Sequence, residues 1–156
     1  MEKKNIQCNV TILSYDELDE KDAELVEKAK QATSGSYSPY SQFSVGAAIR
    51  LADGTIVTGS NQENASYPCG LCAERTALFY ANAQYPTLPV NAIAIAAKNV
   101  NGFLSTPITP CGACRQALLE TELRYKQMIK VLLYGTEKIY CVNSIAELLP
   151  LQFTLS

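Results

Sequence analysis

The sequence contains no histidine among its 156 residues. Imidazole is the most frequent general base in enzymes and a common zinc ligand, so its absence removes two large classes of site. A His–Ser or His–Cys dyad is excluded, and so is any metal site that uses a His ligand. Acid–base chemistry in this protein must therefore run on carboxylate, lysine, tyrosine or thiolate groups.

The sequence also has no surplus of positive charge. Its 13 Lys and Arg residues are balanced by 15 Asp and Glu residues, which gives a formal net charge of −2. Binding to the phosphate backbone of nucleic acids depends on a basic patch, and no cluster of Lys or Arg is visible. The composition therefore favours small-molecule partners over nucleic acid.

Long apolar runs are missing as well. No stretch approaches the roughly 18 apolar residues of a membrane-spanning helix, and residues 1–5 lack the apolar core of a signal peptide. We therefore expect a cytoplasmic protein with no membrane partner. In a reducing compartment, the six cysteines indicate metal or redox chemistry more than disulfide bonds.

What the sequence does contain is the alternation of elements typical of one α/β domain. Its order predicts a mixed sheet with helices on its faces. Residues 19–156 are expected to form this single domain, and residues 1–18 an N-terminal extension of unknown role. Apolar patterns and turn residues predict helices at 19–32, 72–83, 112–123 and 145–149, and strands at 43–51, 55–59, 92–97, 131–134 and 139–142.

Two smaller features concern the ends of the chain. The apolar strip of Val10, Ile12 and Leu13 is compatible with an added edge strand. Near the other end, Ser144 opens the short last helix, and Glu147 stands at its third position. This spacing predicts a capping box, in which each side chain bonds the backbone N–H of the other residue.

Two Cys-x-x-Cys pairs form the strongest motif, Cys69 with Cys72 and Cys111 with Cys114. Four thiolates can bind zinc in a closed structural site. Alternatively, three of them (Cys72, Cys111 and Cys114) bind the metal and leave the fourth position to water. These three residues stand at expected helix starts, where the helix dipole favours thiolate. Spacing alone leaves both arrangements open.

Glu74 favours the open site. It follows Cys72 by two residues, so that its carboxylate can carry protons beside a metal-bound water. Three thiolates around Zn²⁺ leave a negative net charge, which hinders ionisation of that water, and a neighbouring cation would relieve this. Arg75 is the first candidate for a cation that donates to a thiolate sulfur, and Arg115 is the second.

Several motifs resemble the cytidine deaminase family, specifically its small homotetrameric form with an all-cysteine zinc site. The resemblance covers roughly residues 20–153 and implies an α/β fold, a three-layer αβα sandwich with a mixed five-stranded sheet. The matching segments are residues 41–48 (first-strand motif), 59–67 (ribose-binding loop), 72–77 and 110–116 (zinc motifs), and 148–150 with Phe153 (C-terminal segment).

The resemblance implies one catalytic Zn²⁺ per subunit, bound by Cys72, Cys111 and Cys114, with Cys69 a non-ligand. It also implies that Glu74 takes a proton from the attacking water, passes it toward N3 of the pyrimidine, and later protonates the departing amino group. Arg75 would offset the charge of the third thiolate.

The resemblance further assigns the substrate contacts. Asn61 and Glu63 are implied to bind the ribose through its 3′-hydroxyl, and Phe43 to form an aromatic wall beside the base. Phe43 is equally compatible with an ordinary core position. The backbone N–H of Ala73 and the carbonyl near Thr109 would read the pyrimidine edge. A last contact, Phe153, would reach the active site of a neighbouring subunit, so that a homotetramer shares its active sites.

The expected function is zinc-dependent hydrolytic deamination of cytidine and 2′-deoxycytidine in pyrimidine salvage. Three alternatives remain open. A deaminase of aminonucleoside antibiotics shares the fold, although the pair Asn61 and Glu63 with Phe43 favours a plain nucleoside. A nucleotide or polynucleotide deaminase would need basic residues where this loop has a carboxylate. A non-catalytic zinc protein with four cysteine ligands belongs to a different class.

Overall fold

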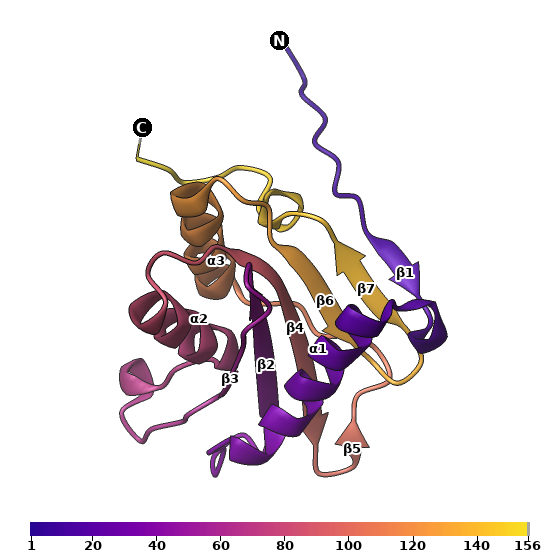
Figure 1. Cartoon of the computed structure of the whole chain (residues 1–156), viewed down its shortest axis with the longest axis vertical. Coiled ribbons are helices and arrows are strands. Elements are labelled where there is room, and N and C mark those ends of the chain that lie inside the picture. The colour runs from indigo at the N-terminus through magenta and orange to yellow at the C-terminus, as the bar shows by residue number, and fades with distance from the viewer. Residues whose placement is uncertain (156) are drawn as a thin grey trace.

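The computed structural model describes residues 1–155 and shows one mixed sheet covered by helices on both faces (Figure 1). The strand order is β1-β7-β6-β4-β2-β3, and β5 pairs with β4. The strands are β1 (Thr11–Leu13), β2 (Ser44–Leu51), β3 (Ile56–Ser60), β4 (Val90–Asn99), β5 (Gly102–Phe103), β6 (Lys130–Tyr134) and β7 (Ile139–Val142). The helices are α1 (Glu20–Ala32), α2 (Ala73–Gln84) and α3 (Gly112–Tyr125), with short 3₁₀ turns η1 (Tyr15–Glu17), η2 (Thr33–Gly35), η3 (Tyr67–Cys69) and η4 (Ile145–Leu148).

The predicted mixed sheet is confirmed. Strands β4 and β6 are parallel, whereas β2 with β3, β2 with β4, β6 with β7 and β1 with β7 pair antiparallel. Helix α3 provides the crossover that a parallel pair requires. None of the helices within residues 1–155 is long and apolar enough to cross a membrane.

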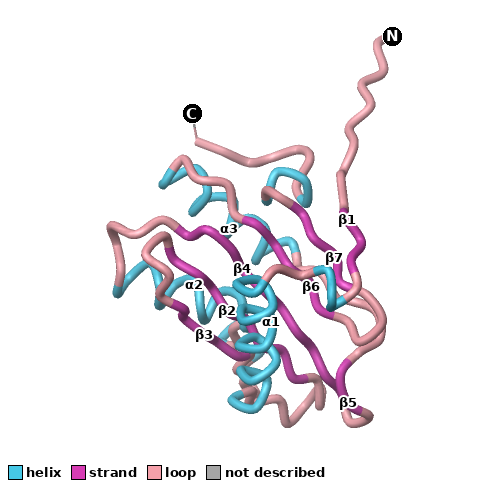
Figure 2. Tube along the Cα trace, turned by 45° about the vertical axis from the view of Figure 1, so that its right-hand side comes forward, coloured by secondary structure: helices cyan, strands magenta, loops and turns pink. Residues whose placement is uncertain are grey.

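Strand β4 separates two cores, because its side chains alternate between the two faces of the sheet. Ile93 and Ile95 face the core under α2 and α3, whereas Ala92, Ala94 and Ala96 face the core under α1. Helix α1 accordingly lies on one face and α2 and α3 on the other (Figure 2). The predicted three-layer arrangement follows from this alternation.

The expected number of five strands is wrong, because the sheet has seven. Strand β5 has only two residues, too few for any apolar alternation to appear in the sequence. Strand β1 has three residues, two of them exposed, and it pairs with β7 at the sheet edge. The added edge strand considered for Val10, Ile12 and Leu13 is thus present over Thr11–Leu13.

The expected capping box of η4 is also wrong, because neither side chain bonds the backbone N–H of the other residue. Ser144 accepts from the backbone N–H of Ala146, but the Glu147 carboxylate accepts from the backbone N–H of Asn9 at 2.7 Å. The N-terminal segment offers a backbone donor that local sequence rules do not consider. A capping box forms instead at Ser14 and Glu17.

Two glycines let the helices approach the sheet closely. A Cβ on Gly59 of β3 would lie 2.5 Å from the backbone nitrogen of Ala77 in α2. On the opposite face, a Cβ on Gly46 of β2 would overlap the carbonyl oxygen of Ala29 in α1. Such contacts leave no room for a side chain. The position of α2, which carries part of the candidate site, therefore depends on Gly59.

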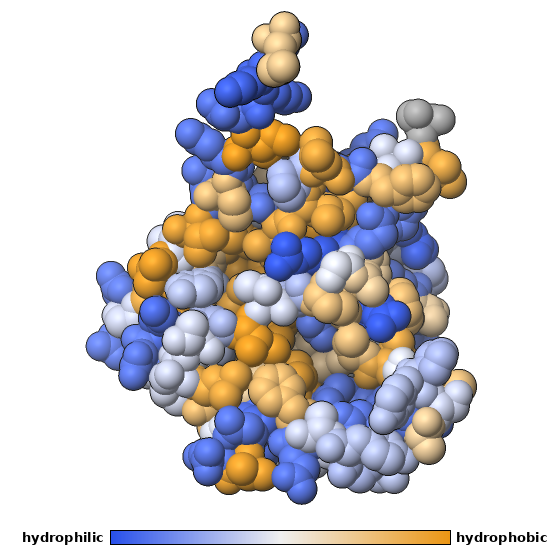
Figure 3. Space-filling model, turned by 180° about the vertical axis from the view of Figure 1, so that it is seen from behind, coloured by the Kyte–Doolittle hydropathy of each residue, from blue (hydrophilic) through white to orange (hydrophobic). Residues whose placement is uncertain are grey.

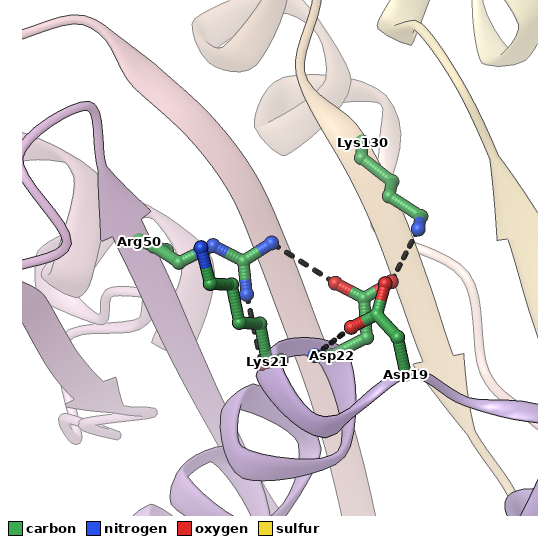
Figure 4. Close-up of polar contacts among 5 residues, drawn as sticks. All are labelled: Asp19, Lys21, Asp22, Arg50 and Lys130. Atoms are coloured by element: carbon green, nitrogen blue, oxygen red, sulfur yellow. Dashed lines mark hydrogen bonds and ion pairs between the residues drawn. The ribbon is translucent and has the colours of Figure 1, made fainter.

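A buried carboxylate ties α1 to two strands (Figure 4). Asp22 is only 2% exposed and accepts from Arg50 Nη2 of β2 at 2.9 Å and from Lys130 Nζ of β6. Arg50 also donates to the carbonyl of Lys21 at 2.8 Å, and Asp19 caps the helix by accepting from the Asp22 N–H. Burial by itself raises the pKa of Asp22, but the hydrogen bonds from Lys130 and Arg50 outweigh it and hold the pKa below its ordinary value.

This arrangement predicts a specific dependence of stability on pH. Because the folded-state pKa of Asp22 is depressed, its contribution is fully present above the unfolded-state pKa of about 3.9 and is lost as pH falls through the folded-state value. Asp22→Asn should lower the free energy of unfolding at pH 7 by roughly 2–3 kcal/mol. It should also flatten the loss of stability below about pH 4. Urea unfolding at several pH values measures both effects.

The exposed residue Asp16 provides the matched control, because Asp16→Asn changes the charge by the same amount at a site without a buried ion pair. The interpretation fails if Asp22→Asn and Asp16→Asn give the same pH profile.

Candidate metal centre and substrate cleft

The N-termini of α2 and α3 bring three thiols together. Cys72 is the N-cap of α2, Cys111 is the N-cap of α3, and Cys114 is the third residue of α3. Their sulfur atoms all lie within 4.8 Å of one another, and those of Cys111 and Cys114 are 3.6 Å apart. The expectation that these residues stand at helix starts is confirmed, and helix dipoles there favour thiolate.

The cluster leaves Cys69 out. Within residues 1–155, the metal-ligating side chains that gather in groups of three or more are Cys72, Cys111 and Cys114 only. Cys69 is exposed, and its thiol donates to Ser66 Oγ at 3.5 Å. The geometry therefore favours three sulfur ligands over a closed site with four.

The donor set fits a divalent cation. Tetrahedral Zn–S bonds of about 2.3 Å place sulfurs about 3.8 Å apart. The sulfurs of Cys111 and Cys114 are close to this spacing at 3.6 Å, and that of Cys72 lies within 4.8 Å of both. A hydrogen bond from Cys114, with help from Arg75, lowers the pKa of Cys72 to about 5. The same contact raises the pKa of Cys114, and burial acts in the same direction. A dication bound between the sulfurs would stabilise its ligands as thiolates.

Glu74 and Arg75 lie next to this cluster in the first turn of α2. The Glu74 side chain is buried, with 5% of the residue exposed. Burial raises the pKa of its carboxyl, and the charge on Cys72 acts in the same direction. Arg75 Nη2 donates to Cys72 Sγ at 3.5 Å, as expected for a cation that offsets thiolate charge. Glu74 is thus a buried acid beside the sulfurs, suited to holding and releasing a proton.

The second candidate cation, Arg115, serves a different purpose. Its guanidinium donates to the carbonyls of Pro110 at 2.8 Å and Leu148 at 2.7 Å, and to Thr109 Oγ1 at 3.1 Å. The next residue, Gln116, donates to the Phe153 carbonyl at 3.0 Å. These contacts join the start of α3 to the C-terminal segment. Sequence patterns did not indicate the contacts with Leu148 and Phe153, because these partners are backbone carbonyls far along the chain.

A cleft of about 590 Å³ opens in front of the cluster. Cys72 and Arg75 form one side of it, and the loop after β3 forms another. The volume suits a ligand of nucleoside size. The remaining lining residues come from two loops and are Tyr40, Ser41, Asn61, Gln62, Glu63, Asn64, Tyr67, Gly70 and Leu71.

Asn61 and Glu63 line this cleft, but both already hold backbone groups in place. Asn61 Oδ1 accepts from Val45 N, and its Nδ2 donates to the Phe43 carbonyl at 2.9 Å. Glu63 accepts from the backbone N–H groups of Tyr40 and Ser41, and also from Ser41 Oγ. A primary amide has two N–H donors and a carboxylate about four acceptor positions, so each side chain retains capacity for a ligand.

The remaining expected substrate contacts lie at different depths. Phe43 is half-buried and packs against the core under α2 rather than lining the cleft. Ala73 is buried at the first position of α2, where a backbone N–H has no partner within the helix. Phe153 is 67% exposed in this single chain. Their assigned roles remain predictions.

A contact between two aromatic residues at the cleft was not predicted from the sequence. The rings of Tyr40 and Tyr67 meet edge to face with centroids 6.3 Å apart, although they come from loops 27 positions apart in the chain. Both are exposed in the single chain. The only sequence signal was the presence of tyrosine in two polar loops, which by itself does not indicate a contact.

Comparison with known proteins agrees with this geometry. The model of the cytidine and deoxycytidylate deaminase zinc-binding region matches residues 19–130. A cytidine deaminase of Halalkalibacterium halodurans is 41% identical over 138 residues, which make up 83% of this chain and 92% of that protein.

Solved structures show the same fold. The crystal structure of cytidine deaminase from Burkholderia pseudomallei superposes with a TM-score of 0.72 at 41% identity, covering 83% of this chain and 97% of that one. The cytidine deaminase structure from Mycobacterium tuberculosis gives a TM-score of 0.68 at 33% identity. The superposition covers all of that chain and 88% of this one, so about an eighth of this chain has no counterpart there.

The three-sulfur arrangement predicts how metal content responds to substitution. Cys69→Ser should leave one zinc ion per chain, because its thiol lies outside the cluster. Cys72→Ser should bring the zinc content close to zero after dialysis against a weak chelator. Metal analysis by mass spectrometry measures both without reference to activity. Loss of zinc from the Cys69→Ser protein would instead establish a site with four cysteine ligands.

Proposed function

The chain belongs to the cytidine and deoxycytidylate deaminase family, and we propose that it is a zinc-dependent hydrolase of cytidine and 2′-deoxycytidine. The products are uridine or 2′-deoxyuridine and ammonia, in pyrimidine salvage. The observation that carries this proposal is the cluster of three thiols beside a buried glutamate, with one of the thiols, Cys72, lining a nucleoside-sized cleft. We further propose that residues 19–156 form one catalytic domain in the cytoplasm.

Cys72, Cys111 and Cys114 would hold one zinc ion per subunit. When bound, zinc supplies a Lewis acid that makes water nucleophilic at neutral pH. Arg75, whose Nη2 lies 3.5 Å from Cys72 Sγ, reduces the negative charge that three thiolates accumulate. With less negative charge at the sulfurs, an anionic oxygen that approaches the site is repelled less.

Glu74 is the proposed proton carrier. It accepts a proton from the attacking water and delivers it to N3 of the pyrimidine. A bond then forms between the water oxygen and C4. Glu74 takes the second proton from the hydroxyl now on C4 and gives it to the amino group, so that the C4–N bond breaks, a carbonyl forms at C4 and ammonia leaves. The burial that raises the pKa of Glu74 supports this role, because the carboxyl must hold each proton between taking it from oxygen and giving it to nitrogen.

The cleft supports a nucleoside as substrate. Asn61 and Glu63 are held rigidly by backbone contacts and retain hydrogen-bonding capacity for the 3′-hydroxyl of a ribose. A carboxylate at this place repels a phosphate group, which disfavours nucleotides and polynucleotides. The Ala73 N–H and the carbonyl near Thr109 are proposed to read the edge of the base, and Phe43 to support it from beneath.

We also propose a homotetramer in which Phe153 completes the active site of a neighbouring subunit. Large apolar side chains are exposed on α2 and near α3, on the side of the sheet opposite α1, and this supports burial of that face in an assembly. Examples are Phe79, Tyr80, Leu123 and Met128, each at least 46% exposed in the single chain.

A substrate panel tests the reaction. Purified zinc-loaded protein should release ammonia from cytidine and 2′-deoxycytidine, much less from cytosine, which lacks the ribose, and least from CMP, which places a phosphate near the cleft. A blasticidin-type aminonucleoside completes the panel. Preference for CMP would indicate a nucleotide deaminase, preference for the aminonucleoside an antibiotic deaminase, and no release from any substrate would contradict the enzyme assignment.

A single substitution tests the proton carrier. Glu74→Gln keeps the size of the side chain but cannot accept a proton, so kcat should fall by roughly 10²–10⁴-fold. Zinc content and the circular dichroism spectrum should stay unchanged. Glu24→Gln, at an exposed position of α1, makes the same charge change away from the cleft and serves as control. Near-normal turnover of the Glu74→Gln protein would rule out this role.

A further inference from the structure

The N-terminal extension projects from the body of the molecule and reaches the outer edge of the sheet at β1, and its residues 8–13 are called the strap below. Its strand β1 pairs with β7 in the register Thr11 with Cys141 and Leu13 with Ile139 (Figures 1 and 2). The region that matches the family begins only at residue 19. The strap therefore lies outside the elements from which the proposed function was argued.

The strap is attached to the turn η4 by a three-bond contact. The backbone N–H of Asn9 donates to Glu147 Oε2 at 2.7 Å, and its side-chain Nδ2 reaches both carboxylate oxygens at 3.2 and 3.3 Å. These bonds lower the pKa of the Glu147 carboxyl, with the backbone bond as the largest cause. Charge-assisted bonds to a carboxylate are stronger than neutral ones. A segment 138 positions away in the chain thus holds the last turn.

The strap and the C-terminal segment (residues 145–153) also face a common groove. A cavity of about 510 Å³ is lined by Val10 and Ile12 on one side and by Leu148, Arg115 and Thr109 on the other. Figure 3 shows apolar side chains gathered on the body of the molecule at the base of the N-terminal arm. The strap therefore lines the same groove as Thr109 and Arg115, which flank the candidate ligands Cys111 and Cys114 in the sequence.

From η4, hydrogen bonds continue to the residues that precede Cys111 of the thiol cluster. Arg115 connects the Leu148 carbonyl at the end of η4 with the Pro110 carbonyl and the Thr109 hydroxyl. Pro110 precedes the candidate ligand Cys111, and Arg115 follows Cys114. Asn9 is thus linked to the loop at residues 109–111 by two sets of hydrogen bonds, which are joined through the adjacent residues Glu147 and Leu148.

We propose that the strap is a positioning element for the active site, which acts by holding the C-terminal segment and, through Arg115, the loop at residues 109–111. Asn9 and Glu147 are the positioning residues. The inference rests on the proposed function, because there the Thr109 carbonyl reads the pyrimidine and Phe153 approaches it from the C-terminal segment.

The physical reason is the weakness of the C-terminal segment alone. Turn η4 is a four-residue 3₁₀ turn, and residues 149–155 contain no helix or strand. Short terminal segments fray unless other parts of the chain hold them. Besides the Asn9–Glu147 contact, three residues hold the segment by hydrogen bonds. Glu122 accepts from Ser144 Oγ and Ile145 N, Arg115 donates to the Leu148 carbonyl, and Gln116 donates to the Phe153 carbonyl. Ile145 and Leu148 also pack into the core under α2 and α3.

Two truncations test the proposal. Removal of residues 1–13 deletes β1 and Asn9, whereas removal of residues 1–7 deletes an exposed arm and leaves the strap in place. Hydrogen exchange should become faster in residues 145–153 only in the longer truncation. The KM for cytidine should rise about fivefold or more there, with kcat within about twofold and zinc content unchanged. Exchange and KM equal to those of the full chain would overturn the proposal.

Glu147→Ala tests the same contact without shortening the chain, and it decides the question if the longer truncation does not fold. Glu147→Ala should reproduce the faster exchange and the higher KM. When it is combined with the longer truncation, it should have no further effect on either, because both changes remove the same contact between Asn9 and Glu147. If the effects of Glu147→Ala and of the longer truncation are fully additive, the strap has a merely structural role. The same conclusion follows if the melting temperature falls while KM and the exchange of residues 145–153 stay unchanged. If the full chain deaminates no nucleoside, the proposed function fails, while the exchange measurement still tests the hold on the C-terminal segment.

Discussion

The structure depends on the meeting of two helix N-termini at one end of the sheet. Cys72 begins α2, and Cys111 and Cys114 begin α3, so the dipoles of both helices favour the same ionised sulfurs. The position of α2 depends on its close approach to β3 at Gly59, and α3 is the crossover that joins the parallel strands β4 and β6. The sheet and its register thereby determine the spacing of three ligands from distant parts of the chain.

The layers on either side of the sheet serve different purposes. Under α2 and α3, the larger side chains Ile93 and Ile95 of β4 support the helices that carry the thiols. Under α1, the alanines of β4 allow a close approach, and the Asp22 contacts with Arg50 and Lys130 fix the start of that helix against β2 and β6. The buried ion pairs of Asp22 and the thiol cluster thus lie on opposite faces of the sheet.

Rigid side-chain contacts also surround the cleft. Asn61 and Glu63 are each bonded to the backbone of a neighbouring segment, and Arg115 joins the start of α3 to the end of η4. A polar group held in this way needs little reordering when a ligand binds, which preserves binding free energy. The contact between Asn9 and Glu147 extends the same kind of support to a segment beyond the region that matches the family.

Local patterns in the sequence were sufficient for the three long helices, the five longer strands, the positions of Cys72, Cys111 and Cys114 at helix starts, and the place of Glu74 close to Cys72, because periodicity, helix starts and Cys spacing are short-range properties. They were insufficient for β5, for the partner of Glu147, for the carbonyls bound by Arg115, and for the meeting of Tyr40 with Tyr67. Each of these depends on a partner brought near by the folded chain. The exclusion of Cys69 from the thiol cluster has the same cause, since the Cys-x-x-Cys spacing is identical in both pairs and only the tertiary arrangement makes them unequal.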